Sequence, residues 1–102
     1  VFARLDLVLA PSFQMVSVQG RRRGREQVVE EIRKAHGVGA TAVWVESAEA
    51  TQLGEGLVVV VYEEWQDRGE GAAGRLSTAV MRHMPALPNE VQWLHLHETP
   101  LV

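Results

Sequence analysis

The sequence predicts one α+β domain, in which a short strand and a helix precede a four-stranded antiparallel meander. Three observations predict this fold: one amphipathic helical segment at residues 25–36, four strand-like segments within residues 41–101, and short glycine-containing turns between them. Short glycine-rich turns between long strands are typical of β-hairpins. With 102 residues, the chain has the usual length of a single domain, and we treat 1–102 as one unit.

Residues 1–10 are expected to form the end of a helix, because apolar residues recur there at helical spacing. We expect this first helix to be truncated, since no capping residue precedes it. Pro11 is expected to end it, and residues 13–18 alternate as a short strand. The arginine-rich run 21–25 is interpreted as a solvated turn. A nucleic-acid-binding role is not expected, because the run lacks interleaved aromatic residues and the net charge is -3.

Residues 25–36 carry the clearest helix pattern. Val28, Val29 and Ile32 form an apolar stripe, and Gly37 supplies the expected stop. Strands follow at residues 41–51, 57–66, 74–84 and 91–101.

Symmetric turns between these strands give a register good to about one residue. It places Tyr62 opposite Ser77 and Glu64 opposite Arg75, and it pairs Ser77 with His97, Ala79 with His95 and Met81 with Trp93. One sheet face then collects the polar and aromatic side chains of Tyr62, Glu64, Arg75, Ser77, Trp93, His95 and His97. The opposite face is more apolar and is expected to pack against the helix: Val59, Val61, Trp65, Leu76, Val80, Leu94 and Leu96.

The polar face supplies the candidate site. His97, or His95, is the expected general acid or base, since a histidine titrates near neutral pH. Arg75 beside Glu64 is either a clamp for an anionic group or a plain cross-strand ion pair. Tyr62, Ser77 and Trp93 are expected to orient a ligand, with further binding residues at Ser17 and Trp44.

Two other chemistries are less well supported. A metal held by the His95-x-His97 pair needs a third ligand, for which Glu64 is the best available, so no metal is expected. Ser77 beside His97 suggests an activated nucleophile, but the chain has no nucleophile elbow. The absence of cysteine excludes disulfides and thiolate chemistry, and we expect no cofactor.

Residues 57–99 resemble the C-terminal half of the nuclear transport factor 2-like superfamily, which includes SnoaL-like cyclases, ketosteroid isomerase and uncharacterised bacterial domains. The resemblance is carried by Tyr62-Glu63-Glu64-Trp65, by residues 74–79 and by the ending Trp93-Leu94-His95-Leu96-His97-Glu98-Thr99. It implies a cystatin-like fold, with a cone-shaped, curved antiparallel sheet wrapped around N-terminal helices. It also implies a pocket at the wide end and a homodimer through the β-sheet.

The resemblance does not extend to the isomerase mechanism. The isomerase's general base is a carboxylate on the strand that corresponds to residues 13–18, where this chain offers Ser17 and no Asp or Glu. We therefore expect a SnoaL-like domain that binds a small hydrophobic or anionic ligand, as an isomerase or cyclase that uses histidine chemistry. The alternative is a non-catalytic dimerisation module, in which the polar face meets its two-fold mate.

The longest apolar run, residues 57–62, is too short to cross a membrane, and no nucleic-acid or membrane partner is expected. A cytoplasmic location is expected.

Overall fold

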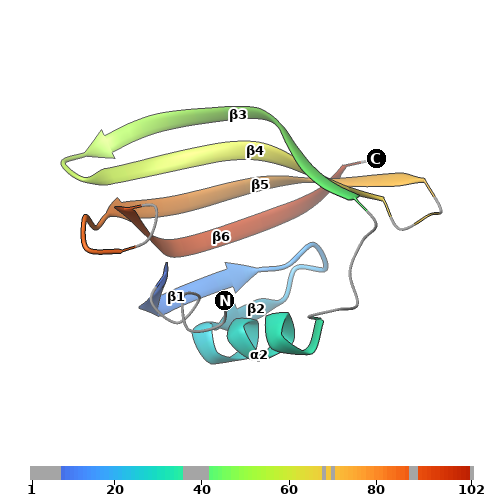
Figure 1. Cartoon of the computed structure of the whole chain (residues 1–102), viewed down its shortest axis with the longest axis horizontal. Coiled ribbons are helices and arrows are strands. Elements are labelled where there is room, and N and C mark those ends of the chain that lie inside the picture. Colours follow the sequence, from blue (N-terminus) through green and yellow to red (C-terminus); the bar gives the residue numbers. More distant parts are fainter. Residues whose placement is uncertain (1–7, 36–41, 68, 70, 88–89, 102) are drawn as a thin grey trace.

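The computed structural model describes residues 8–35, 42–67, 69, 71–87 and 90–101. Six strands form one curved sheet in the order β2-β1-β6-β5-β4-β3, and helix α2 lies against one face (Figure 1). The elements are β1 (Leu9–Val16), β2 (Arg22–Gly24), α2 (Arg25–Ala35), β3 (Ala42–Gly54), β4 (Leu57–Asp67), β5 (Ala72–His83) and β6 (Val91–Leu101). The α+β class and the cystatin-like architecture expected from the sequence are confirmed.

The meander β3-β4-β5-β6 also follows the prediction, because each turn has the required chemistry. Gly56 has a φ of 71° in the two-residue turn after β3, and Gly69 and Gly71 have φ values of 91° and 103° between β4 and β5. Glycine adopts such positive values without steric cost. The strands differ in length from the predicted ones, most of all β3, which continues three residues further to Gly54.

The N-terminal part differs from the prediction. Leu9, Ala10 and Pro11 belong to β1 and do not form a helix end, because β1 pairs with β6 in parallel from Leu9 to Val16. That pairing is irregular between Leu9 and Gln14, and the exposed Pro11 lies within the irregular stretch. There its missing N–H removes no ladder hydrogen bond. The helix expected before Leu9 and the stop expected at Gly37 fall outside the described residues.

The basic run is also more ordered than a solvated turn. Arg22–Gly24 forms the edge strand β2, which pairs antiparallel with β1, and the helix starts at the next residue. The Gln27 side chain accepts a hydrogen bond from Gly24 N at 3.0 Å, which satisfies a donor at the helix start. Arg25 Nε donates to Leu9 O at 3.2 Å and so ties the start of α2 to β1.

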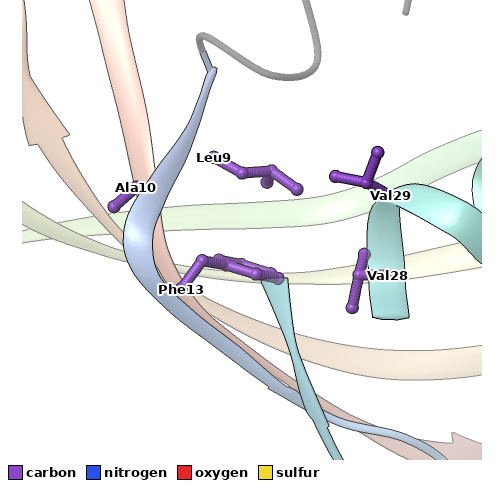
Figure 2. Packing of buried hydrophobic residues seen from close by; sticks show 5 residues of the cluster. All are labelled: Leu9, Ala10, Phe13, Val28 and Val29. Carbon is purple, nitrogen blue, oxygen red and sulfur yellow. The ribbon is translucent and has the colours of Figure 1, made fainter. Parts of the chain in front are cut away.

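Helix α2 contributes its apolar stripe to a small core. Leu9 and Phe13 on β1 point towards Val28 and Val29 on α2, whereas Ala10 lies on the other side of β1 (Figure 2). Met15, Trp93, Leu94 and Leu96 are partly buried against this cluster. Ile32, at the far end of the stripe, remains 44% exposed. Within the described residues, no helix has the length and apolar character needed to cross a membrane.

The register of β5 with β6 decides which residues face the helix. Met81 pairs with Trp93 as predicted, but β6 then contains one extra residue, so that Val80 pairs with His95. Beyond this bulge Thr78 lies opposite His97, and Ser77 lies opposite Glu98. The predicted pairing of Ser77 with His97 is therefore wrong. A shift of one residue moves every following side chain to the other face of the sheet.

The prediction of which sheet face the helix covers is also wrong. The helix packs on the face that carries Tyr62, Arg75 and Trp93, and not on the face of Val59, Val61 and Leu76. The apolar residues of β1 and α2 need a partner surface, and the bulge supplies it by turning Trp93 and Leu96 to the same side. We call the helix-covered side the inner face and the other side the outer face.

Candidate functional site

A cavity of about 500 Å³ lies between α2 and the inner face of the sheet. Its apolar wall comes from β1, α2 and β6, and consists of Val8, Leu9, Phe13, Met15, Val28, Ile32, Trp93 and Leu96. Its polar lining residues are Glu31, Tyr62, Glu64, Gln66, Arg75 and Glu98. A mostly apolar wall with a few polar groups is typical of small-molecule sites. A smaller hollow of about 340 Å³ near Gly56 has the polar lining residues Gln52, Arg82 and His83 and no carboxylate.

The polar groups meet because three strands bring them into adjacent rows. Tyr62 on β4, Ser77 on β5 and Glu98 on β6 lie opposite one another, and Glu64 and Arg75 form the next row. We call these five residues the polar cluster. Neighbours across a sheet lie close enough for direct side-chain contact.

Arg75 links the carboxylates of the polar cluster. Its Nη1 donates a hydrogen bond of 3.0 Å to Glu98 Oε1, and its Nε lies 4.0 Å from Glu64 Oε2. Glu98 is therefore the principal partner, and Glu64 lies only at the outer limit of an ion pair. The sequence interpretation that pairs Arg75 with Glu64 has the correct register but misses the stronger contact.

Burial controls protonation in the polar cluster. Glu98 is 5% exposed, and this burial raises the pKa of its carboxyl above the ordinary value of 4.5, although the charge of Arg75 and its hydrogen bond oppose the shift. Burial, followed by the negative charge of Glu64, raises the pKa of Tyr62 above 10.0. Tyr62 is therefore a neutral hydroxyl group at physiological pH.

The fifth member of the polar cluster is Ser77 on β5. Its side chain is fully buried opposite Tyr62, and against the larger effect of burial a hydrogen bond with Ser77 lowers the pKa of the Tyr62 hydroxyl. Ser77 lies between Tyr62 and Glu98 on the inner face.

The structure brings together five of the predicted site residues and separates the others. Tyr62, Glu64, Arg75 and Trp93 line the cavity, and Ser77 lies on the same face. His95 and His97 do not join them, since the bulge places both on the outer face. His97 is exposed there, and Glu64 is on the opposite side of the sheet from both histidines, which removes it as the proposed third metal ligand.

Ser17 and Trp44 also lie away from the cavity lining. Ser17 stabilises the turn after β1, where its hydroxyl donates to Gln19 Oε1 at 3.2 Å and accepts from Arg21 N at 3.4 Å. Trp44 lies on the edge strand β3, where it pairs with Trp65 of β4. Its indole donates to Glu46 Oε2 at 2.9 Å. Among the described residues, no three histidine, cysteine, aspartate or glutamate side chains are grouped so as to hold a metal ion.

Glu98 is the site residue that sequence reasoning missed. Strict alternation along residues 91–99 puts Glu98 on the same side as Leu94 and Leu96, opposite the histidines, and we expected that side to be core. A carboxylate within a supposed core face is a warning signal, because buried carboxylates need a partner. The partner on the inner face is Arg75, and only the bulge makes the two meet.

Comparisons with known proteins agree with this architecture. The family model described as sucrose-6-phosphate phosphohydrolase C-terminal matches residues 1–102. A search of the curated proteins gives no match.

Three solved structures illustrate the shared fold. An NTF-2 like protein of unknown function from Pseudomonas aeruginosa has a TM-score of 0.84 and 24% identity, over 96% of this chain and 79% of that one. An NTF2-like protein of unknown function in nutrient uptake from Rhodospirillum rubrum has a TM-score of 0.79 and 17% identity, over 99% and 85%. A protein from Parabacteroides distasonis, proposed to be a ketosteroid isomerase, has a TM-score of 0.75 and 13% identity, over 98% and 74%. These likenesses confirm the resemblance in fold and carry no activity.

Proposed function

Because the chain belongs to the family of sucrose-6-phosphate phosphohydrolase C-terminal domains, we propose that it is a ligand-binding domain of nuclear transport factor 2-like fold whose cavity takes a small molecule. The molecule has an apolar body that packs against Phe13, Met15 and Trp93, and one polar end that meets the polar cluster. The observation that carries this proposal is Glu98, a carboxylate only 5% exposed at the end of a mostly apolar cavity. A buried ionisable group with a shifted pKa in a cleft is a candidate functional residue.

The same geometry changes the expected chemistry. His95 and His97 lie on the outer face, so an isomerase or cyclase reaction in this cavity has to move its proton through another group. Glu98 is the best placed of the described residues, because its raised pKa brings it closer to neutral pH than an ordinary carboxyl. An anionic ligand has less support than a neutral one, since Glu98 already engages Arg75.

Binding of naphthol to the full chain tests the proposal. We expect wild-type protein to bind this probe and Ile32→Trp to bind it about tenfold less tightly, because the larger side chain fills the cavity mouth from α2. Titration followed by amide and indole NMR signals measures both affinities and the site.

The matched control is Leu76→Trp on the outer face, where the wild-type residue is 40% exposed against 44% for Ile32. It should bind naphthol like wild type. If naphthol does not bind, or if Ile32→Trp binds it as tightly as Leu76→Trp does, the cavity is not the binding site.

The outer face favours a second candidate role, a homodimer through the sheet. It exposes Trp44 by 38% and Leu76 by 40%, and Trp65 is half-buried across Gly74, where a Cβ atom would lie 2.7 Å from the indole ring. Carboxylates lie on the β3–β4 side and imidazoles on β6: Glu46, Glu49 and Glu63 against His95 and His97. A two-fold axis along the strands sets β3 and β4 of one copy over β6 of the other, so these groups are complementary.

Sedimentation velocity at micromolar concentration tests this role. We expect wild-type protein to be a dimer and Leu76→Arg to be a monomer, because the substitution buries two unpaired charges at the two-fold interface. Leu53→Arg is the control, since Leu53 is 61% exposed near the β3–β4 turn. A monomeric wild type, or a dimer that Leu76→Arg leaves intact, contradicts the proposal.

A further inference from the structure

The charges around the cavity are unbalanced. Three carboxylates and one guanidinium line it, from Glu31, Glu64, Glu98 and Arg75. Glu31 forms an ion pair with Arg23, which lies outside the lining, and Glu98 forms one with Arg75. Among the described residues, Glu64 is left with only the 4.0 Å approach of Arg75 Nε, which is too long for a hydrogen bond. The polar cluster therefore carries one carboxylate more than it has cations.

Glu64 is also within reach of a ligand. Its side chain is 27% exposed, and it lines the cavity next to Tyr62 and Arg75. The cavity lining therefore offers carboxylate oxygens of Glu64 and Glu98 as hydrogen-bond acceptors. A group with several donors and a positive charge matches them, whereas an anion meets two carboxylates at close range.

We propose that the polar end of the cavity holds a cation, namely the ammonium group of a largely apolar amine, and that Glu64 is the residue that selects it. This inference rests on the proposed function, because it names the chemical class of the same cavity's ligand. Arg75 has a positioning role in this arrangement. It holds Glu98 on the inner face and leaves Glu64 to the ligand.

Three probes with the same ring test the charge preference: naphthalenemethylamine, naphthalenemethanol and naphthoate. We expect the protonated amine to bind wild-type protein about tenfold more tightly than the alcohol at neutral pH, and naphthoate to bind most weakly. Glu64→Gln keeps the size of the side chain and removes its charge, so it should weaken the amine's binding more than the alcohol's and abolish the preference for the amine. Isothermal titration calorimetry measures all affinities.

The chain supplies a close control. Glu63→Gln changes the adjacent residue, which lies on the outer face and accepts a hydrogen bond from Trp65 Nε1 at 3.0 Å. It should keep the full preference for the amine. If the alcohol binds as tightly as the amine, or if Glu64→Gln keeps the preference, the cation proposal is wrong while the binding cavity stands. If none of the three probes binds, the binding function itself fails.

Discussion

Replacing Phe13 with alanine is expected to lower the free energy of unfolding by about 3–5 kcal/mol. Phe13 is 2% exposed and packs against Leu9, Val28 and Val29, in a core of few fully buried side chains. The described part of the chain offers little other apolar packing to compensate for the cavity that alanine leaves. Domains of this size have a stability of only about 5–15 kcal/mol, so the variant should lose a large share of it. Urea unfolding followed by circular dichroism measures the loss.

Two further variants make this result specific. Phe13→Leu keeps much of the volume and should lose less than about half as much. Leu53→Ala removes a large apolar side chain that is 61% exposed, and should change the stability by less than about 1 kcal/mol. If the free energy of unfolding of Phe13→Ala lies within about 1 kcal/mol of the wild-type value, which is roughly the effect of an ordinary surface substitution, β1 does not pack against α2 as described.

Replacing Arg75 with methionine is expected to cost about 2 kcal/mol at neutral pH, because it leaves the Glu98 carboxylate in the protein interior without its cation. The loss stays below the roughly 3–5 kcal/mol typical of fully buried pairs, since the Arg75 side chain is 30% exposed and water screens part of its charge. The double variant Arg75→Met with Glu98→Gln should recover most of the stability. A double variant no more stable than Arg75→Met contradicts the role assigned to Glu98.

The pH dependence of the Arg75→Met loss follows from the pKa of Glu98. That pKa is raised in the folded protein, so the folded state binds more protons than the unfolded state at pH values between 4.5 and the folded pKa. The contribution of Glu98 to stability is therefore greatest below this window and falls as the pH rises through it. Removing Arg75 raises the pKa further and deepens the fall. Urea unfolding at several pH values between 4.5 and neutral measures this effect. The difference in unfolding free energy between wild type and Arg75→Met should grow as the pH rises, and adding Glu98→Gln should reduce the pH dependence of both proteins.

Half of the polar cluster was predictable from local patterns. The glycine turn between β4 and β5 fixes the register that sets Tyr62 opposite Ser77 and Glu64 opposite Arg75, and the structure keeps this register. Tight turns constrain their strands strongly, so neighbours across a hairpin can be inferred by counting residues. The pairing of Met81 with Trp93, next to the second turn, was predictable in the same way.

The other half depends on the bulge in β6. Nothing in residues 91–99 marks an extra residue after Trp93, because alternation looks the same with or without it. The bulge replaces His97 with Glu98 in the row of Ser77, and so exchanges an expected imidazole for a buried carboxylate. Packing decides this exchange, since Trp93 and Leu96 both face the apolar residues of β1 and α2 only if one residue is accommodated between them.

By itself, the sequence determined the element order from α2 onwards, the hairpin turns and the fold class, because these depend on periodicity and turn chemistry within a few residues. Only the tertiary structure decided the parallel pairing of β1 with β6, the face that α2 covers and the meeting of Arg75 with Glu98. Those three features depend on contacts between residues far apart in the chain. Their free energy comes from burying β1 and α2 against the sheet, and no local pattern records which face of the sheet receives them.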